Sequence, residues 1–239
     1  MLQTKRALLF LLCFAFLGSL PAFATSDGPD YYRVTGVTAN DVLNIRAAPA
    51  ASGAKIGTIP YDSTGIANLG CVGGLTYAEW EKATDDERSA ASKTRWCRVG
   101  YDRTIGWVAG WFLTESDADD HFRAGDALSD IAGSEWQLRD FSGEAPGAEA
   151  WISFKSDNTV VGSGGCNNFS GMHTPGKGAP LFSPIAATRM MCPEPQMQTE
   201  TRLFQVLDEA REMVSYQLVM ALFDGSGTLL ATLTRSDSD

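Results

Sequence analysis

Two pairs of cysteines carry most of the chemistry that this chain of 239 residues could perform. Cys71 and Cys97 mark the two ends of one loop of about 26 residues, and Cys166 and Cys192 mark the ends of another loop of the same length. Such cysteines can form disulfides, bind a metal ion or act as nucleophiles. A structural zinc site normally takes cysteines about two to four residues apart, a spacing that neither pair has. The spacing therefore disfavours zinc.

A thiol nucleophile needs a base within hydrogen-bonding reach. The chain has two histidines, His121 in an Asp-rich stretch and His173 shortly after Cys166. No Cys-His-Asp set can be argued from them, and no pair of carboxylates stands out as an acid and a base. We therefore expect no enzymatic activity, and the sequence indicates no cofactor and no metal site.

Residues 1–24 have the pattern of an export signal. Lys5 and Arg6 precede an apolar run over residues 7–17, which is too short to span a bilayer. Small residues near Ala24 suit signal peptidase, so cleavage is expected after it. Two alternatives stay open: an uncleaved signal anchor, and a lipoprotein anchored through Cys13, which lacks the small preceding residues of a lipobox. The pattern predicts a periplasmic or secreted protein.

Export sets the redox conditions for the cysteines, because disulfides persist in oxidising compartments. We therefore expect one bridge between Cys71 and Cys97, another between Cys166 and Cys192, and none between the two halves of the chain. The chain-entropy model gives each bridge up to about 3.5 kcal/mol. Free thiols or a metal pair are the alternatives for Cys71 and Cys97.

The chain is acidic, with a formal net charge of −10. Loss of residues 1–24 would remove Lys5 and Arg6 and no acidic residue, which makes the charge more negative still. Acidic surface is repelled by nucleic acid phosphates and by anionic lipids. No nucleic-acid partner is therefore expected. No later segment is apolar enough for stable membrane insertion after signal cleavage.

An aspartate-rich segment, residues 116–128, lacks hydrophobic periodicity and is interpreted as a solvated linker. It separates two expected domains, residues 31–115 and residues 129–236. Few contacts should cross such a linker, so each domain is expected to unfold by itself.

Short β-type segments separated by Gly, Pro and Asn fill the first domain and predict a small barrel. Two motifs, LNIRAAP at residues 43–49 and GWVAGWFL at residues 106–113, resemble those of a bacterial SH3-type domain. This resemblance implies a non-catalytic module that binds cell-wall peptides or other envelope ligands in a shallow groove.

Residues 74–93 interrupt the SH3-type pattern as an insertion in a hairpin loop. Thr76 with Glu79, and Thr84 with Glu87, have the spacing of capping boxes, which predicts one or two short helices. The expected disulfide of the first domain would close the base of this insertion.

Four aromatic residues near the expected loops are candidates to line the groove of the first domain. They are Tyr31, Tyr32, Trp80 and Trp111. The alternative is that these rings pack in the core, which is the favoured interpretation for Trp107.

The second domain is expected to be mostly β with one helix. Strands are predicted around Trp136 and over residues 150–154, 159–162, 216–222 and 228–233, with a hairpin turn at Asp157-Asn158. The main helix is predicted over residues 194–212, begun by two prolines. The aromatic residues expected to face the core are Trp136, Trp151, Phe154 and Phe204.

Two stretches of the second domain, GCNNFSG at residues 165–171 and TRMMCP at residues 188–193, resemble the signature of the META (HslJ-like) family of small bacterial envelope proteins. The resemblance implies a β fold with one helix and names no ligand. Arg189 is expected to anchor the fold through hydrogen bonds, or else to hold a ligand at the mouth of a barrel. Met190 and Met191 are expected to pack against the domain, with the alternative that one of them is exposed, because adjacent residues of a strand point to opposite faces.

The sequence as a whole predicts a mainly β protein, a small SH3-like barrel followed by a META domain with one main helix. The expected function is envelope binding or adaptor work, with the first domain engaging a cell-wall or peptide ligand and the second serving as a disulfide-closed scaffold. The alternative is an envelope stress-response, inhibitor or chaperone-like protein that acts on envelope proteins through the second domain.

Overall fold

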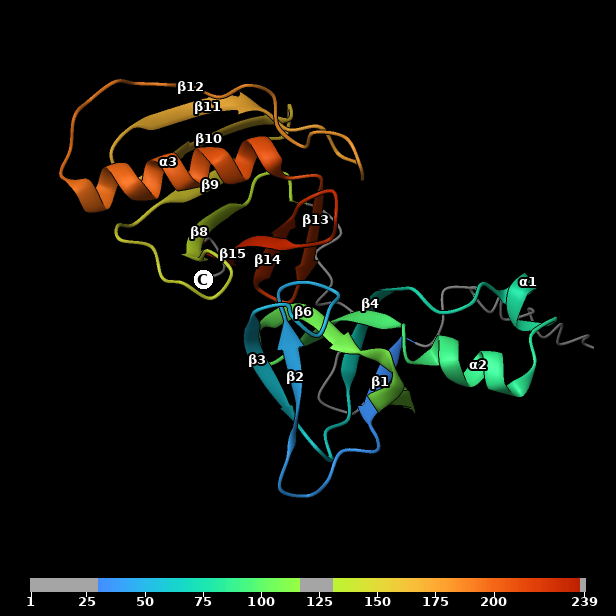
Figure 1. Cartoon of the computed structure of the whole chain (residues 1–239). Helices are drawn as coiled ribbons and strands as arrows, with labels where there is room; N and C mark the ends of the chain where they lie inside the picture. Colours follow the sequence, from blue (N-terminus) through green and yellow to red (C-terminus); the bar gives the residue numbers. More distant parts are fainter. Residues whose placement is uncertain (1–29, 117–130, 237–239) are drawn as a thin grey trace, which may run out of the picture.

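The computed structural model describes residues 30–116 and 131–236, which form two antiparallel sheets (Figure 1). The predicted mainly β class with one main helix is confirmed. The predicted signal segment, and residues 117–128 of the predicted linker, lie outside the described residues. Within the described part of the chain, no helix is both long and apolar enough to cross a membrane.

The first sheet has seven strands and curls around a small core. Its strand order is β3-β2-β6-β5-β4-β1-β7. Alternate side chains of β1 and β2 are buried, as expected for strands with one face on a core, whereas β5 and β6 are buried at consecutive positions. The strands are β1 (Tyr31–Val34), β2 (Val42–Arg46), β3 (Lys55–Pro60), β4 (Ile66–Val72), β5 (Trp96–Tyr101), β6 (Thr104–Ala109) and β7 (Leu113–Ser116).

The insertion between β4 and β5 forms two short helices, α1 (Tyr77–Trp80) and α2 (Asp85–Ser92), which project away from the barrel (Figure 1). Both predicted capping boxes are present. The backbone N–H of Thr76 donates a hydrogen bond to the carboxylate of Glu79, and the backbone N–H of Thr84 donates one to the carboxylate of Glu87, both at 2.8 Å. No residue of either helix is buried, so the caps are the local interactions that fix where these helices begin.

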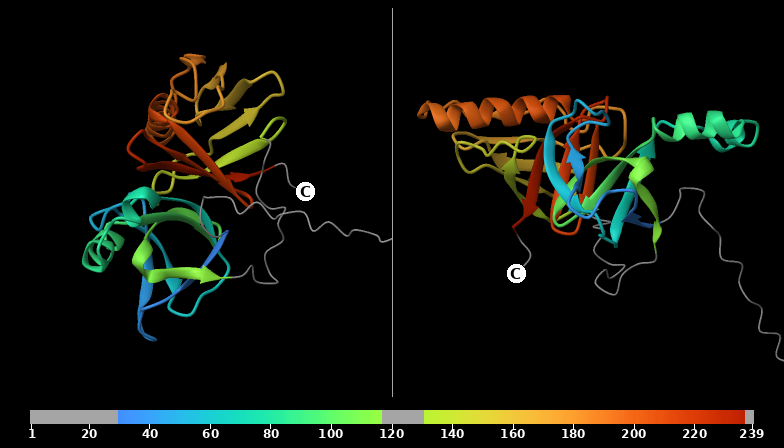
Figure 2. Two further views of the ribbon diagram at one scale, coloured as in Figure 1. Left: turned by 90° about the vertical axis from the view of Figure 1, so that its right-hand side faces the viewer. Right: turned by 60° about the horizontal axis from the view of Figure 1, so that its bottom comes forward.

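The second sheet has eight strands in the order β12-β11-β10-β9-β8-β15-β14-β13, and the long helix α3 (Glu194–Glu209) lies across it (Figures 1 and 2). Leu203, Val206 and Leu207 of α3 enter the core of this domain. Its strands are β8 (Glu135–Asp140), β9 (Trp151–Phe154), β10 (Thr159–Ser163), β11 (Asn168–Met172), β12 (Ala186–Ala187), β13 (Glu212–Tyr216), β14 (Val219–Phe223) and β15 (Leu229–Arg235).

Two predicted boundaries in the second domain are wrong. The main helix ends at Glu209, three residues short of the predicted 194–212, because Ala210 turns to an extended backbone conformation. The strand predicted over residues 216–222 is instead the end of β13, a tight turn and β14. That turn places Gln217 at a φ of 52°, without the Gly or Asn that usually marks such a position.

Strand β14 is buried along its whole length and connects two cores. Met220 and Leu222 point into the core of the second domain, whereas Val219, Ala221 and Phe223 belong to a cluster shared with the first domain. The buried members of this shared cluster are Ala47, Ala67, Ile105 and Trp107 from the first domain, and Tyr216, Val219, Ala221, Phe223 and Leu229 from the second.

Hydrogen bonds also cross between the domains. The indole Nε1 of Trp107 donates to the carbonyl of Gly227 across 2.7 Å, and the N–H of Leu229 donates to the carbonyl of Ala47 across 2.8 Å. The expectation that few contacts cross between the domains is therefore wrong. One face of β14 contributes to the apolar cluster that the two domains share, and this cluster joins them. Figure 2 shows the two domains lying against each other.

Candidate ligand groove of the first domain

A groove of about 340 Å³ opens on the first domain where the loop before β2 meets the short 3₁₀ turn after β6. Trp111 and Phe112 of that turn (Gly110–Phe112) form one wall with Trp96 of β5. The Trp96 and Trp111 rings meet edge to face at 5.9 Å between centroids. Trp111 keeps 38% of its surface exposed, so the groove offers a flat aromatic surface to a ligand.

Polar side chains face this aromatic wall. Asp41, Asn44 and Arg46 also line the groove. The Nη1 of Arg46 donates to the carbonyl of Gly53 across 2.9 Å, which holds this guanidinium on the neighbouring loop. The Oδ1 of Asn44 is buried and has no hydrogen-bond partner among the described residues.

The insertion leaves the groove open, since no residue of 74–93 lines it. Trp80 of the insertion lies instead in a separate hollow between the insertion and β4, where the Arg88 guanidinium covers its ring at 4.2 Å. Trp80 is half exposed, but it shares no wall with Trp111.

The other two predicted ligand-binding aromatics pack inside the protein. Tyr32 is 4% exposed in the core of the first domain, where its hydroxyl lies 3.5 Å from Cys71 Sγ and accepts a hydrogen bond from Arg95. Burial raises the pKa of Tyr32, so the phenol is neutral. Tyr31 packs against the cluster between the domains. Neighbouring residues of a strand point to opposite faces, so the two tyrosines lie on different sides of β1, and neither of them lines the groove.

Of the four predicted aromatics, the groove therefore contains Trp111. Trp96, Phe112 and Asn44 were not predicted. Phe112 directly follows Trp111 in the motif at residues 106–113. Asn44 lies within the motif at residues 43–49, at a position where alternation predicts a side chain away from the core.

Both expected disulfides are present, one joining Cys71 to Cys97 and the other joining Cys166 to Cys192. The first ties β4 to β5 at the base of the insertion, where the two cysteines are directly paired across the strands. Among the described residues, no group of three or more His, Cys, Asp and Glu side chains is arranged to hold a metal ion.

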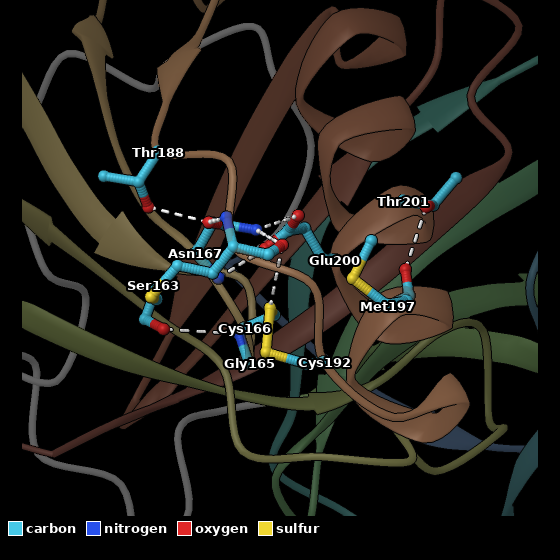
Figure 3. Close-up of a disulfide and its surroundings, with 10 residues drawn as sticks. Ser163, Gly165, Cys166, Asn167, Thr188, Cys192, Met197, Glu200 and Thr201 are labelled. Atoms are coloured by element: carbon cyan, nitrogen blue, oxygen red, sulfur yellow. Dashed lines mark hydrogen bonds between the residues drawn. A yellow bond between two sulfur atoms is a disulfide. The ribbon is translucent and has the colours of Figure 1, made fainter.

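Next to the Cys166–Cys192 disulfide, Asn167 is the centre of a buried hydrogen-bond network (Figure 3). Its side-chain oxygen accepts from the Thr188 hydroxyl at 2.8 Å and from the Met190 N–H at 2.6 Å. Its backbone N–H and its side-chain Nδ2 both donate to the carboxylate of Glu200 on α3, at 2.6 and 2.9 Å. Asn167 thereby fastens both signature stretches to the helix.

This network performs the anchoring role that the sequence assigned to Arg189. Arg189 is exposed, so the prediction that it anchors the fold is wrong. Met190 and Met191 are also exposed, by 54% and 97%, and do not pack as predicted. The segment is held by backbone groups and by the disulfide, which leaves its side chains free to point outward.

Comparison with protein families agrees with this architecture. The family model described as bacterial SH3 domain matches residues 41–114, and the model described as META domain matches residues 129–237. The chain is a bacterial SH3 domain followed by a META domain. The resemblances drawn from the motifs of the two domains are therefore confirmed.

Similar solved structures each cover about half of this chain. An NMR structure of a protein from Burkholderia xenovorans is 21% identical, covers 52% of this chain and 95% of its own, and has a TM-score of 0.38. A crystal structure of a DUF4847 family protein from Bacteroides vulgatus is 15% identical, covers 47% of this chain and 99% of its own, with a TM-score of 0.35. No protein with a curated description matches the chain.

Proposed function

We propose that this protein is a non-catalytic binding module of the bacterial envelope. In this proposal the SH3 domain takes a peptide or cell-wall ligand in the Trp111 groove, and the META domain is a disulfide-closed scaffold. The observation that carries the proposal is the exposed Trp111 ring, which lines the groove together with Trp96 and Phe112. Such an aromatic surface suits a peptide-like ligand, whose amide planes and apolar groups can stack on it.

The groove is lined by one acidic and one basic side chain, Asp41 and Arg46, and the guanidinium of Arg46 is held by the carbonyl of Gly53. Asp41 is exposed at the rim of the groove, and its carboxylate accepts a hydrogen bond from the backbone N–H of Val42 at 2.8 Å. The stem peptides of the cell wall carry free amino groups, which match the carboxylate of Asp41. Two disulfides fit a periplasmic or extracellular location, where such peptides occur.

The test is co-sedimentation with purified peptidoglycan. The wild type is expected to pellet with it, and Trp111→Ala should weaken binding by about tenfold or more, because a central aromatic contact is worth about 1–3 kcal/mol. Trp80→Ala is the matched control: it removes an equally large, more exposed ring outside the groove and should leave binding unchanged. Equal losses in both variants, or no sedimentation of the wild type, would exclude the proposed groove.

A second function, contact with envelope proteins through the META domain, is favoured by one observation. Met190 and Met191 lie side by side as exposed apolar side chains, and exposed methionines adapt to varied protein partners. Capture of a protein from an envelope extract that survives Trp111→Ala but not a Met190→Ser, Met191→Ser double variant would support this function in place of the first.

A further inference from the structure

The hollow between the insertion and β4 has a volume of about 650 Å³ and shares no lining residue with the Trp111 groove. This volume is within the range of small-molecule sites, about 300–1,000 Å³. Two arginines, Arg88 and Arg95, line the hollow, and no acidic side chain of the described residues does. A chain with a formal net charge of −10 therefore carries a hollow whose lining is positively charged.

Arg95 precedes β5 and is exposed, yet its side chain is held in place. Its Nη2 donates to the hydroxyl of Tyr32 across 3.4 Å and to Cys71 Sγ across 3.3 Å, and Cys71 itself lines the hollow. The aliphatic part of Arg95 lies over two glycines. A Cβ added at Gly110 would come within 3.1 Å of Arg95 Cγ, and one added at Gly74 within 3.6 Å of Arg95 Cβ. These contacts fix the guanidinium at the wall of the hollow.

The charge of Arg95 has no partner in the fold. Arg95 is in no ion pair with a described residue, whereas the guanidinium of Arg98 pairs with Glu212. The hydrogen bonds of Arg95 to described side chains all come from Nη2, so the N–H groups on Nε and Nη1 are left to bind a ligand. Ordering a long cationic side chain costs rotamer entropy, and here no carboxylate offsets that cost.

Arg88 of α2 and Trp80 of α1 form the wall that the insertion contributes. The Arg88 guanidinium lies over the Trp80 ring, 4.2 Å from its centroid, and Arg88 Nε donates to the Trp80 carbonyl across 3.0 Å. Trp80 still keeps 50% of its surface exposed. The partner of Arg88, Asp85, has a 99% exposed side chain, so water screens this pair. Neither helix buries a residue, so the stacked pair adds nothing to the core of the barrel.

We propose that this hollow binds a phosphomonoester whose phosphate is attached to a flat, ring-shaped group. The phosphate would accept hydrogen bonds from Nε and Nη1 of Arg95, and the ring would lie against the exposed surface of Trp80. A phosphomonoester carries a charge of about −1.5 to −2 near neutral pH, which matches two arginines better than the single charge of a carboxylate does. The site is separate from the Trp111 groove and does not depend on the function proposed for it.

The proposal is tested on the intact protein with phenyl phosphate, propyl phosphate and phenylacetate. Propyl phosphate keeps the phosphate but has an aliphatic chain, as a lipid phosphate has, and phenylacetate keeps the ring but has a carboxylate. The NMR signals of the Arg95 Nε–H and the Trp80 indole N–H report the two contacts. We expect phenyl phosphate to shift both signals. It should bind about fivefold more tightly than propyl phosphate and about tenfold more tightly than phenylacetate.

Variants separate the two contacts and assign the two signals. Arg95→Gln should weaken phenyl phosphate by about tenfold or more, whereas Arg33→Gln, the same change at an exposed arginine of β1 outside the hollow, should weaken it by less than about twofold. Trp80→Ala should remove the advantage of phenyl phosphate over propyl phosphate. Arg88→Gln should weaken both phosphates by about fivefold, and it remains informative if Arg95→Gln does not fold.

Three results would overturn the proposal. The first is equal weakening by Arg95→Gln and Arg33→Gln, which would show a general effect of charge. The second is equal affinity for phenyl phosphate and propyl phosphate, which would show that Trp80 does not hold a ring and would favour an aliphatic source such as a lipid headgroup. The third is the absence of any shift of the Arg95 signal at about 10 mM phenyl phosphate.

Discussion

The guanidinium of Arg98 in the SH3 domain donates a hydrogen bond to the carboxylate of Glu212 in the META domain across 2.8 Å. The two side chains are 6% and 15% exposed, so this ion pair is shielded from water. Arg98 also lies over the rings of Trp107 and Phe223, one from each domain. The pair therefore lies within the apolar interface and couples the stability of one domain to that of the other.

Removal of one partner of this pair should destabilise the whole protein. Glu212→Gln leaves the Arg98 charge buried without its carboxylate, which should lower the free energy of unfolding by about 3 kcal/mol. Urea denaturation of the wild type and the variant measures this difference in the free energy of unfolding. The control is Glu144→Gln, which breaks the exposed Arg202–Glu144 pair, also 2.8 Å long, and should cost less than about 1 kcal/mol. Equal costs for the two variants would contradict a buried role for Glu212.

The same pair predicts how stability depends on pH. Burial acts to raise the pKa of Glu212, but hydrogen bonds and charge from Arg98 and Lys177 outweigh it and lower the pKa below its usual value. A lowered folded-state pKa gives stability that is fully present above the unfolded value, about 4.3, and is lost as the pH falls through the folded value. The stability gap between wild type and Glu212→Gln should thus be constant near neutral pH and shrink below about pH 4. A stability gap that widens as the pH falls would show that the pKa of Glu212 is raised in the folded protein, which would contradict the prediction.

The shared core predicts that the two domains stay together without a covalent connection. Cleavage at a protease site engineered into residues 117–130 should leave the fragments associated in gel filtration. Phe223→Asp should separate them after cleavage, because it places a charge in the interface cluster, where Phe223 is fully buried. Fragments of the cleaved wild type that elute separately would show that the interface is too weak to hold the domains.

Asn167 is predicted to matter more for stability than its neighbour in the same motif. Asn167→Ala removes a donor to the buried carboxylate of Glu200 and an acceptor for Met190, and should cost about 2–4 kcal/mol. Asn168→Ala alters an exposed side chain one residue away and should cost less than about 1 kcal/mol. Thermal unfolding under non-reducing conditions compares them. Similar melting temperatures for the two variants would contradict the anchoring role of Asn167.

Local signals explain which features were predictable from the sequence. The capping boxes at Thr76 and Thr84, and the turn at Asp157-Asn158, depend on residues close in the chain, and the structure contains all three. The two disulfides were predicted from the expected export of the chain and from the equal loop lengths, and both are present. The extra strand β13 was missed because the turn at Gln217 carries no glycine or asparagine.

Features that depend on contacts between distant residues were not predictable in the same way. The docking of the domains was missed, although the unbroken apolar run of β14 is typical of a strand that is covered on both faces. Trp111 was a predicted groove residue and lines the groove, but Tyr32 lies in the core, and Trp96, which was not a candidate, lines the groove. The sequence does not show which aromatic residue of a curled sheet faces inward when neighbouring positions are equally apolar.

The most direct test of the proposed function is NMR mapping of a soluble cell-wall muropeptide on the intact protein. The chain has six tryptophans, whose indole N–H signals report on separate parts of the structure. The account predicts that the muropeptide shifts the signals of Trp96 and Trp111 and leaves those of Trp80 and Trp136 in place. Shifts confined to Trp80 or to the META domain, or no shift at saturating muropeptide, would contradict it.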